Sequence, residues 1–374
     1  MKYKTLILLY LLSTSFITSL HSGLKKEDFE GEIDGKKVHL FVLTNKKGYE
    51  VAITNYGGSR AAIMVPDKNG KLDNVAHGHD SLTNYLNSPK KHLSTLVGRY
   101  GNRIKDGNFV LDKEVYQLEK NNKNNHLHGG TNGFNKKVWD AVQMGFNEVR
   151  MYYTSEDGEE GYPGKLYMEV VFTFNDDNEL KIAYRGNTTK KTIVNMTHHL
   201  FVNLDGVKEP LTTVEDHLLQ LNAKFYLPTD ENQIPTGEIK RVDGTPFDFW
   251  TPRAIGERIN DNNPQLKTGD GYDHCFVVTK KVFGELAFAG KLVAPKSGRT
   301  MEIYTTEPGL QMYTANSHNG FVAYHGVKMI RRSGVAFEAQ HFPNSPNVGF
   351  FPSVVLNPGQ TYTQTTIYKF GVEK

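Results

Sequence analysis

Cysteine is almost absent from this chain of 374 residues, which contains only Cys275. A single cysteine excludes the intrachain disulfides that many exported proteins use to stabilise a small fold. The free energy of folding must therefore come from core packing, and a chain of this length can bury a large core.

The chain also lacks a large excess of either positive or negative charge. The chain has 44 lysine and arginine residues against 41 aspartate and glutamate residues, for a formal net charge of +3. Basic residues form short pairs such as Lys136-Lys137 and Arg331-Arg332 rather than longer runs. Nucleic-acid-binding proteins present a basic patch or stripe, so we predict no nucleic-acid partner.

Long apolar runs are missing everywhere except at the beginning. There the sequence reads MKYKTLILLYLLSTSFITSLHSG, with Lys2 and Lys4 before an apolar stretch and small residues at Ser19 and Ser22 for cleavage. This pattern predicts a secretory signal peptide over residues 1–22, and a secreted or periplasmic mature chain without membrane contact. An uncleaved membrane anchor is the alternative, although the stretch is short for a span and its second half is rich in Ser and Thr.

Helical patterns are scarce, with short candidates at residues 80–88 and 254–259. Strand patterns dominate, and we expect a hairpin over 165–188 with its turn at 175–178, a strand over 195–204, and a second hairpin over 353–370. Many strands separated by Gly and Asn turns are typical of a β-sandwich or barrel. Because no flexible linker or internal repeat is visible, the sequence predicts one all-β domain over residues 23–374.

The strand expected over 195–204, NMTHHLFVNL, carries two adjacent histidines, His198 and His199. Neighbouring residues on a strand point to opposite faces, so one of the two should face inward or into a cleft.

Other polar residues also interrupt apolar or glycine-rich stretches. They lie in GRYGNRIKDG, NNHLHGG, GDGYDHCF, EPGLQMYTAN and GVAFEAQHFPNSPN. Glu338 is the clearest case, since Phe337 and Ala339 flank it in a core-like strand. Buried polar groups cost several kcal/mol unless they have partners, so these groups should meet each other, water or a ligand. The residues alone predict a polar cleft of the composition that binds sugars.

In these stretches the chain resembles the aldose 1-epimerase (galactose mutarotase) family, from about residue 29 to residue 369. The markers occur in the family's order as GRYGNRI, NHLHGG, DGEEGYPG, THHLFVNL, PTGEI, TPFDF, GYDH, EPGLQMYTAN and EAQHFPNSPN. The resemblance implies a large antiparallel β-sandwich with few short helices, and an isomerase that uses no cofactor and no metal.

The resemblance also implies roles for individual residues. His199 matches the family's general acid and Glu338 its general base. The remaining matches are residues that hold the sugar: Asn102, Arg103, His128, Asp273 and Gln311. The chain departs from the family pattern at His198, where asparagine is usual, and at Phe201-Val202, where the family has a tyrosine and a second aromatic residue.

These roles imply a reaction in which Glu338 takes the proton of the anomeric hydroxyl while His199 protonates the ring oxygen of a free hexose. We expect Glu338 ionised and His199 protonated, since their attraction and the nearby Asp273 favour the imidazolium. The substrate is a small-molecule aldose, glucose or galactose, and a monomer is sufficient. Two alternatives stay open: a carbohydrate-binding protein without turnover, and a metal site of His126, His128, His199 and Glu338.

Overall fold

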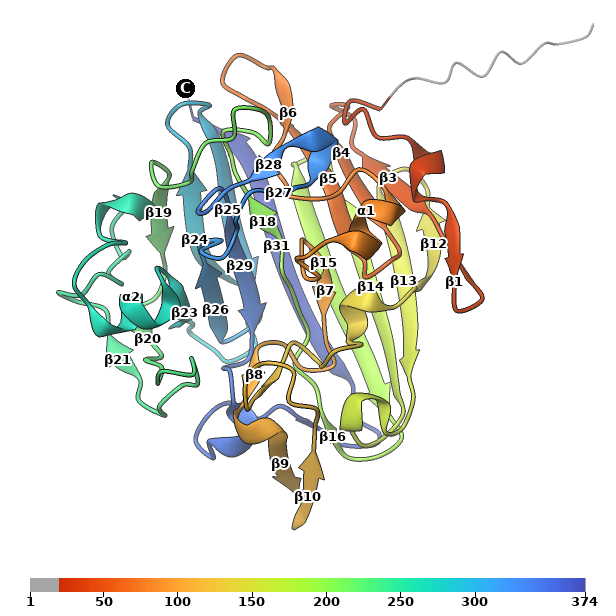
Figure 1. Cartoon of the computed structure of the whole chain (residues 1–374), viewed down its shortest axis with the longest axis vertical. Helices are drawn as coiled ribbons and strands as arrows, with labels where there is room; N and C mark the ends of the chain where they lie inside the picture. Colours follow the sequence, from red (N-terminus) through yellow and green to blue (C-terminus); the bar gives the residue numbers. More distant parts are fainter. Residues whose placement is uncertain (1–19, 374) are drawn as a thin grey trace, which may run out of the picture.

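The longest strands of the protein pair in a nine-stranded antiparallel sheet (Figure 1). The computed structural model describes residues 20–373. In spatial order the sheet consists of β12 (Asp140–Met144), β13 (Glu148–Ser155), β14 (Leu166–Phe174), β15 (Glu179–Thr188), β31 (Tyr362–Val372), β25 (Arg299–Thr305), β24 (Ala287–Val293), β19 (Leu218–Leu221) and β22 (Arg253–Ala254). Buried and more exposed residues alternate along β14 and β15, so one face of the sheet is covered and the other meets solvent.

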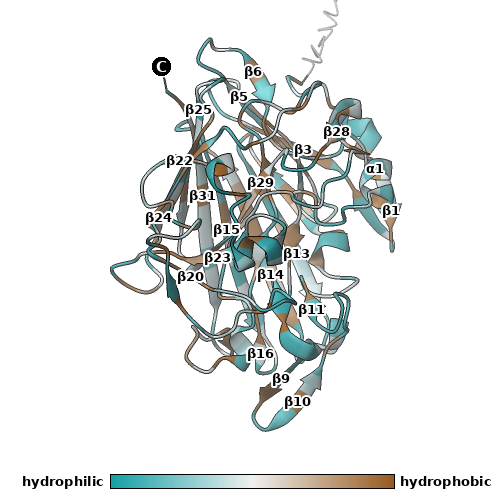
Figure 2. Ribbon diagram, turned by 60° about the vertical axis from the view of Figure 1, so that its left-hand side comes forward, coloured by the Kyte–Doolittle hydropathy of each residue, from teal (hydrophilic) through white to brown (hydrophobic). Residues whose placement is uncertain are grey.

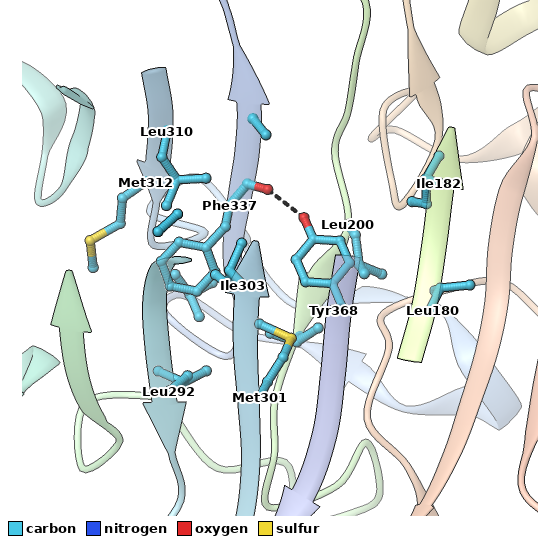
Figure 3. Close-up of a cluster of buried hydrophobic side chains, with 14 of the residues drawn as sticks. Leu180, Ile182, Leu200, Leu292, Met301, Ile303, Leu310, Met312, Phe337 and Tyr368 are labelled. Carbon is cyan, nitrogen blue, oxygen red and sulfur yellow. Dashed lines mark hydrogen bonds between the residues drawn. The ribbon is translucent and has the colours of Figure 1, made fainter. Parts of the chain in front are cut away.

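A six-stranded sheet covers the buried face. It consists of β18 (Phe201–Val202), β29 (Val335–Gln340), β26 (Gly309–Tyr313), β23 (Asp273–Val277), β20 (Phe225–Tyr226) and β21 (Lys240–Arg241). Figure 3 shows Phe337 of β29 packed near Ile303 of β25 and Tyr368 of β31 within the apolar cluster shared by the two sheets. The predicted all-β sandwich is confirmed.

Smaller sheets surround the two large ones. A four-stranded sheet consists of β3 (Leu40–Thr44), β4 (Glu50–Thr54), β5 (Ser59–Pro66) and β6 (Leu72–Asn74). Two-stranded pairs are β1 (Gly31–Ile33) with β2 (Lys36–Val38), β7 (Leu96–Val97) with β17 (Thr197–His198), β8 (Arg103–Ile104) with β11 (His126–Leu127), β9 (Asn108–Leu111) with β10 (Glu114–Gln117), β16 (Thr192–Ile193) with β30 (Val355–Leu356), and β27 (Phe321–Val322) with β28 (Lys328–Met329). Figure 2 shows hydrophilic colouring over peripheral strands such as β6 and β10.

The described helices are short. α1 (Leu82–Asn87) begins where the Ser81 side chain accepts a hydrogen bond from the N–H of Asn84, which confirms the helix expected over 80–88. The second expected helix, over 254–259, is only a 3₁₀ turn at Ile255–Glu257. α2 (Pro264–Gly269) was not foreseen, although Asn263 and Pro264 provide a cap and a favourable first position.

The expected hairpins have different outcomes. β14 and β15 pair in register from Leu166–Thr188 to Phe174–Leu180, which confirms the first. The second is wrong, because β30 pairs with β16 and β31 pairs with β15 and β25. The expected continuous strand over 195–204 is also wrong: it consists of two-residue strands β17 and β18, which pair with different partners on either side of His199 and Leu200.

The predicted signal peptide lies almost entirely outside the described residues, which begin at Leu20. The backbone N–H groups of His21 and Ser22 donate to the buried Glu50 carboxylate at 3.0 and 3.2 Å. The carbonyl of Ser22 accepts from the Tyr324 hydroxyl. From Leu20 to Glu373, no helix has the length and apolar character needed to span a membrane. The division into leader and single domain stays a prediction.

Candidate active site

All but one of the residues that the sequence places in the site line one cavity of about 690 Å³. Its walls include Asn102, Arg103, His128, His199, Asp273 and Glu338. These residues come from loops and strands that lie far apart in the sequence, so the fold brings them together. A cavity of this size falls within the usual range for small-molecule sites.

Glu338 reaches the cavity because side chains alternate along β29. Phe337 packs into the core between the two large sheets, and Glu338 points to the other face. Its Oε1 is 3.4 Å from Nε2 of His199. Its Oε2 is buried and has no hydrogen-bond partner among residues 20–373. Burial and then the negative charge of Asp273 raise the pKa of Glu338 well above its ordinary value, although Arg103 opposes the shift.

His199 occupies the break between β17 and β18. Its N–H donates to the carbonyl of Thr95 at 2.9 Å, and its carbonyl accepts from the N–H of Ser94 at 3.1 Å, so backbone bonds fix the residue. Burial, and then His92, lower the pKa of His199 to about 3. These shifts oppose the resting charges expected from the sequence, because burial favours the neutral imidazole in the protein alone.

His198 points away from the cavity, as strand alternation predicts. Its ring is fully buried, with Nδ1 2.8 Å from the Tyr184 hydroxyl and Nε2 2.8 Å from the Tyr368 hydroxyl. Only one of the two adjacent histidines thus faces the site.

Asn102, Arg103 and His128 are held together by the short β8–β11 pairing. The N–H of Asn102 donates to His128 Nδ1 at 3.1 Å, and the His128 N–H donates to the Asn102 carbonyl at 3.1 Å. Because Nδ1 is an acceptor, a neutral His128 carries its proton on Nε2 and can donate it to a ligand. Both residues adopt left-handed backbone conformations, with φ of 63° and 53°.

Asp273 lies at the centre of a hydrogen-bond network. Gln311 donates to its Oδ1 at 2.7 Å, and Gln233 donates to its Oδ2 at 2.7 Å. Arg103 in turn donates to Gln233 at 2.6 Å. Burial raises the pKa of Asp273, while Arg103 and the two glutamines oppose the shift. Gln311, expected to hold the sugar, lies behind Asp273 and orients it.

Several cavity residues were not foreseen. Gln233 comes from a loop whose sequence gave no sign of a site. His92, Tyr313 and His318 also line the cavity, and both ring nitrogens of His318 are buried without a partner in the described part of the chain. Phe201, noted above as a departure from the family pattern, also lines the cavity, and its ring is tilted against that of His199 with the centroids 4.7 Å apart.

The alternative of a metal site requires four residues, and the structure brings only three of them together. His128, His199 and Glu338 have potential ligand atoms within 4.8 Å of one another. His126, however, points elsewhere and is bonded to the Glu119 carbonyl and the Tyr162 hydroxyl, because the left-handed backbone at His128 ends the alternation. His128 keeps a proton on the nitrogen that would face an ion, since its Nδ1 accepts from Asn102. These donors suit a hydroxylated ligand better than a cation.

Comparison with known proteins gives a consistent result. The family described as aldose 1-epimerase matches residues 39–369. The galactose mutarotase of Bos taurus is 38% identical over 323 residues, which cover 86% of this chain and 91% of that protein. The aldose 1-epimerase of Escherichia coli (strain K12) is 33% identical over 342 residues, which cover 91% of this chain and 97% of that protein.

Solved structures agree. A GalM/aldose epimerase homologue from C. elegans has a TM-score of 0.83 and 28% identity, with 90% of this chain and 100% of that chain covered. A galactose 1-epimerase from Lactobacillus acidophilus has a TM-score of 0.80 and 27% identity, with 92% and 97% covered. This chain therefore belongs to the aldose 1-epimerase family, a family of isomerases.

Proposed function

We propose that this aldose 1-epimerase interconverts the α and β anomers of free hexoses with Glu338 as general base and His199 as general acid. The observation that carries the proposal is the buried pair itself. The two groups lie 3.4 Å apart in the cavity, and both Glu338 Oε2 and His199 Nδ1 lack partners among residues 20–373. A base and an acid that face one cavity are the two groups that ring opening requires.

The chemistry follows from where protons must move. Glu338 takes the proton of the anomeric hydroxyl while His199 gives a proton to the ring oxygen. The bond between the anomeric carbon and the ring oxygen then breaks and leaves an aldehyde and a chain hydroxyl. Rotation of the aldehyde followed by closure on its other face gives the second anomer, with both proton transfers reversed.

The pKa directions place the shared proton on Glu338 in the protein alone, because burial raises the pKa of Glu338 and lowers that of His199. A bound sugar reverses this preference. Its anomeric hydroxyl donates to the carboxylate and its ring oxygen accepts from the imidazole N–H, so each stabilises the charged form. Nε2 of His199 lies 3.4 Å from Oε1 of Glu338, so the charged forms of the two groups also attract each other.

The surrounding groups would orient the sugar. His128 can donate from Nε2, Asp273 can accept, and Arg103 can donate from its guanidinium. Asp273 and Arg103 are both tied to Gln233, so their positions are coupled before a ligand arrives. Fixed partners of this type reduce the entropy lost when the sugar is oriented for reaction.

Replacing Glu338 by Gln tests the assignment. The amide keeps the shape but cannot take a proton, so we expect kcat for anomer interconversion to fall by about 10²–10⁴-fold while sugar affinity stays close to the original. Polarimetry on freshly dissolved α-D-glucose and α-D-galactose measures the rate, and calorimetric titration measures the affinity.

Full activity of Glu338→Gln would overturn its role as base. No acceleration by the original protein with either sugar would instead favour a protein that binds carbohydrate without turnover. Comparing the rates with the two sugars also shows which sugar the protein prefers. The name galactose mutarotase, given to several relatives, leads us to expect galactose. Because one chain supplies every cavity residue described, we further propose that the protein acts as a monomer.

A further inference from the structure

His198 forms a buried hydrogen-bond chain on the side of the sheet away from the sugar. Its ring lies between two hydroxyls, those of Tyr184 and Tyr368, each 2.8 Å from a ring nitrogen. The Tyr368 hydroxyl also lies 2.7 Å from the carbonyl oxygen of Phe337, as the dashed line in Figure 3 shows. All three polar side chains are at most 2% exposed.

The direction of every bond in this chain is determined. A carbonyl oxygen can only accept, so Tyr368 donates its single proton to Phe337. Its oxygen must then accept from His198 Nε2–H, and a neutral His198 has Nδ1 free to accept from Tyr184. Burial, and then the charge of Arg60, lower the pKa of His198 well below its ordinary value, which agrees with a neutral ring.

The chain connects the neighbours of both reacting groups. His198 directly precedes His199, and Phe337 directly precedes Glu338. β17, which carries His198, pairs with β7 and not with β29, so the backbone ladder joins the two segments only beyond His199, where β18 pairs with β29. We propose that His198 is a positioning residue which, through Tyr368, fixes the separation and orientation of His199 and Glu338. This inference rests on the roles proposed above for those two residues.

The shape of imidazole explains why histidine suits this position. Its donor and acceptor lie on opposite sides of a ring and can contact two hydroxyls at once. Asparagine, the residue that the family pattern implies here, carries both groups at the end of a shorter side chain. An asparagine at this position would keep at most one of the two links, and the connection to Phe337 would weaken.

Two conservative variants separate this role from simple stabilisation. Tyr368→Phe and Tyr184→Phe each remove one hydroxyl from the same imidazole, but only the first breaks the link to Phe337. We expect Tyr368→Phe to lower kcat by about 10–100-fold with KM nearly unchanged, because small misplacement of reacting groups is costly while the sugar-holding residues lie on other segments. Tyr184→Phe should retain most of kcat. Polarimetry well below each melting temperature gives both constants.

His198→Asn should resemble Tyr368→Phe, and the double variant should be no slower than either single variant, because both changes break one chain. Equal kcat values for the two phenylalanine variants, additive losses, or a loss confined to KM would overturn the inference. Failure of the proposed function looks different: an inactive original protein, or a fully active Glu338→Gln variant, removes the proposed function and this inference together.

Discussion

At the scale of single residues, the proposed mechanism predicts that the proton shared by Glu338 and His199 sets the pH dependence of the reaction. The pair works only when it holds one proton. Below the pKa of His199, which burial lowers to about 3, the pair takes a second proton and lacks a base. Above the pKa of Glu338, which burial raises well above its ordinary value, the pair loses its proton and lacks an acid.

We therefore expect kcat/KM, which reports the free enzyme, to be level between an acid limb far below the ordinary histidine range and an alkaline limb well above the ordinary carboxyl range. Initial polarimetric rates from acid to alkaline buffers measure the profile, with the uncatalysed rate subtracted at each pH. An acid limb near the ordinary histidine value of about 6.5 would contradict the expectation.

The sequence predicts part of this site for physical reasons. Strand alternation shows that one of His198 and His199 faces inward, and Glu338 is conspicuous because Phe337 and Ala339 flank it. Gln233 was missed because it lies in a loop with φ of 62°, where no periodic pattern operates. The resting charges were also missed, because the pKa shifts depend on burial that only the folded chain reveals.

At the scale of elements, strands β26 and β29 carry Gln311 and Glu338 side by side in register. A partly buried ion pair joins the segments next to these strands, with His341 Nδ1 2.6 Å from the Glu307 carboxylate. Burial acts to lower the pKa of His341, but the charge of Glu307 and the hydrogen bond to it outweigh burial, so the pKa is raised.

A histidine with a raised pKa in the folded state stabilises the fold at low pH and loses that effect as pH rises. The contribution is complete below the unfolded value of about 6.5 and disappears as pH passes through the higher folded value. We expect His341→Gln to lower the free energy of unfolding by about 2 kcal/mol near pH 6, with a smaller loss at alkaline pH. Urea denaturation at both pH values measures this, and an equal loss at both would contradict it.

Strand pairings between segments close in the sequence were predictable, and pairings between segments far apart in the sequence were not. The hairpin of β14 and β15 follows from two alternating stretches and a turn between them. β31 shows the limit: its sequence identifies a strand, but its partners β15 and β25 both lie earlier in the chain, beyond other strands. Pairing over such distances depends on the whole core, which a local pattern does not contain.

At the scale of the whole molecule, the contacts of the first described residues bear on export. The backbone of His21 and Ser22 supplies two hydrogen bonds to the buried Glu50, and Ser22 also accepts from Tyr324. We propose that the chain is exported and that its leader is removed at Ser19 rather than at Ser22. Cleavage before Gly23 would remove these backbone donors from a buried carboxylate, at a cost of about 1–3 kcal/mol.

The corresponding measurement is the mass and amino-terminal sequence of the protein recovered from the medium or periplasm of an expressing cell. We expect a mature chain that begins at Leu20. A chain that begins at Gly23 would contradict the proposed cleavage position, and an intact leader on membrane-bound protein would favour the anchor instead.

The single cysteine provides a chemical probe of local opening in the folded protein. Cys275 is 2% exposed on β23, two residues beyond Asp273, and burial raises the pKa of its thiol. An alkylating reagent can reach this sulfur only when the apolar cluster that Cys275 forms with Leu227, Phe342 and Phe351 opens. The labelling rate therefore reports how often this cluster opens beside the strand that carries Asp273.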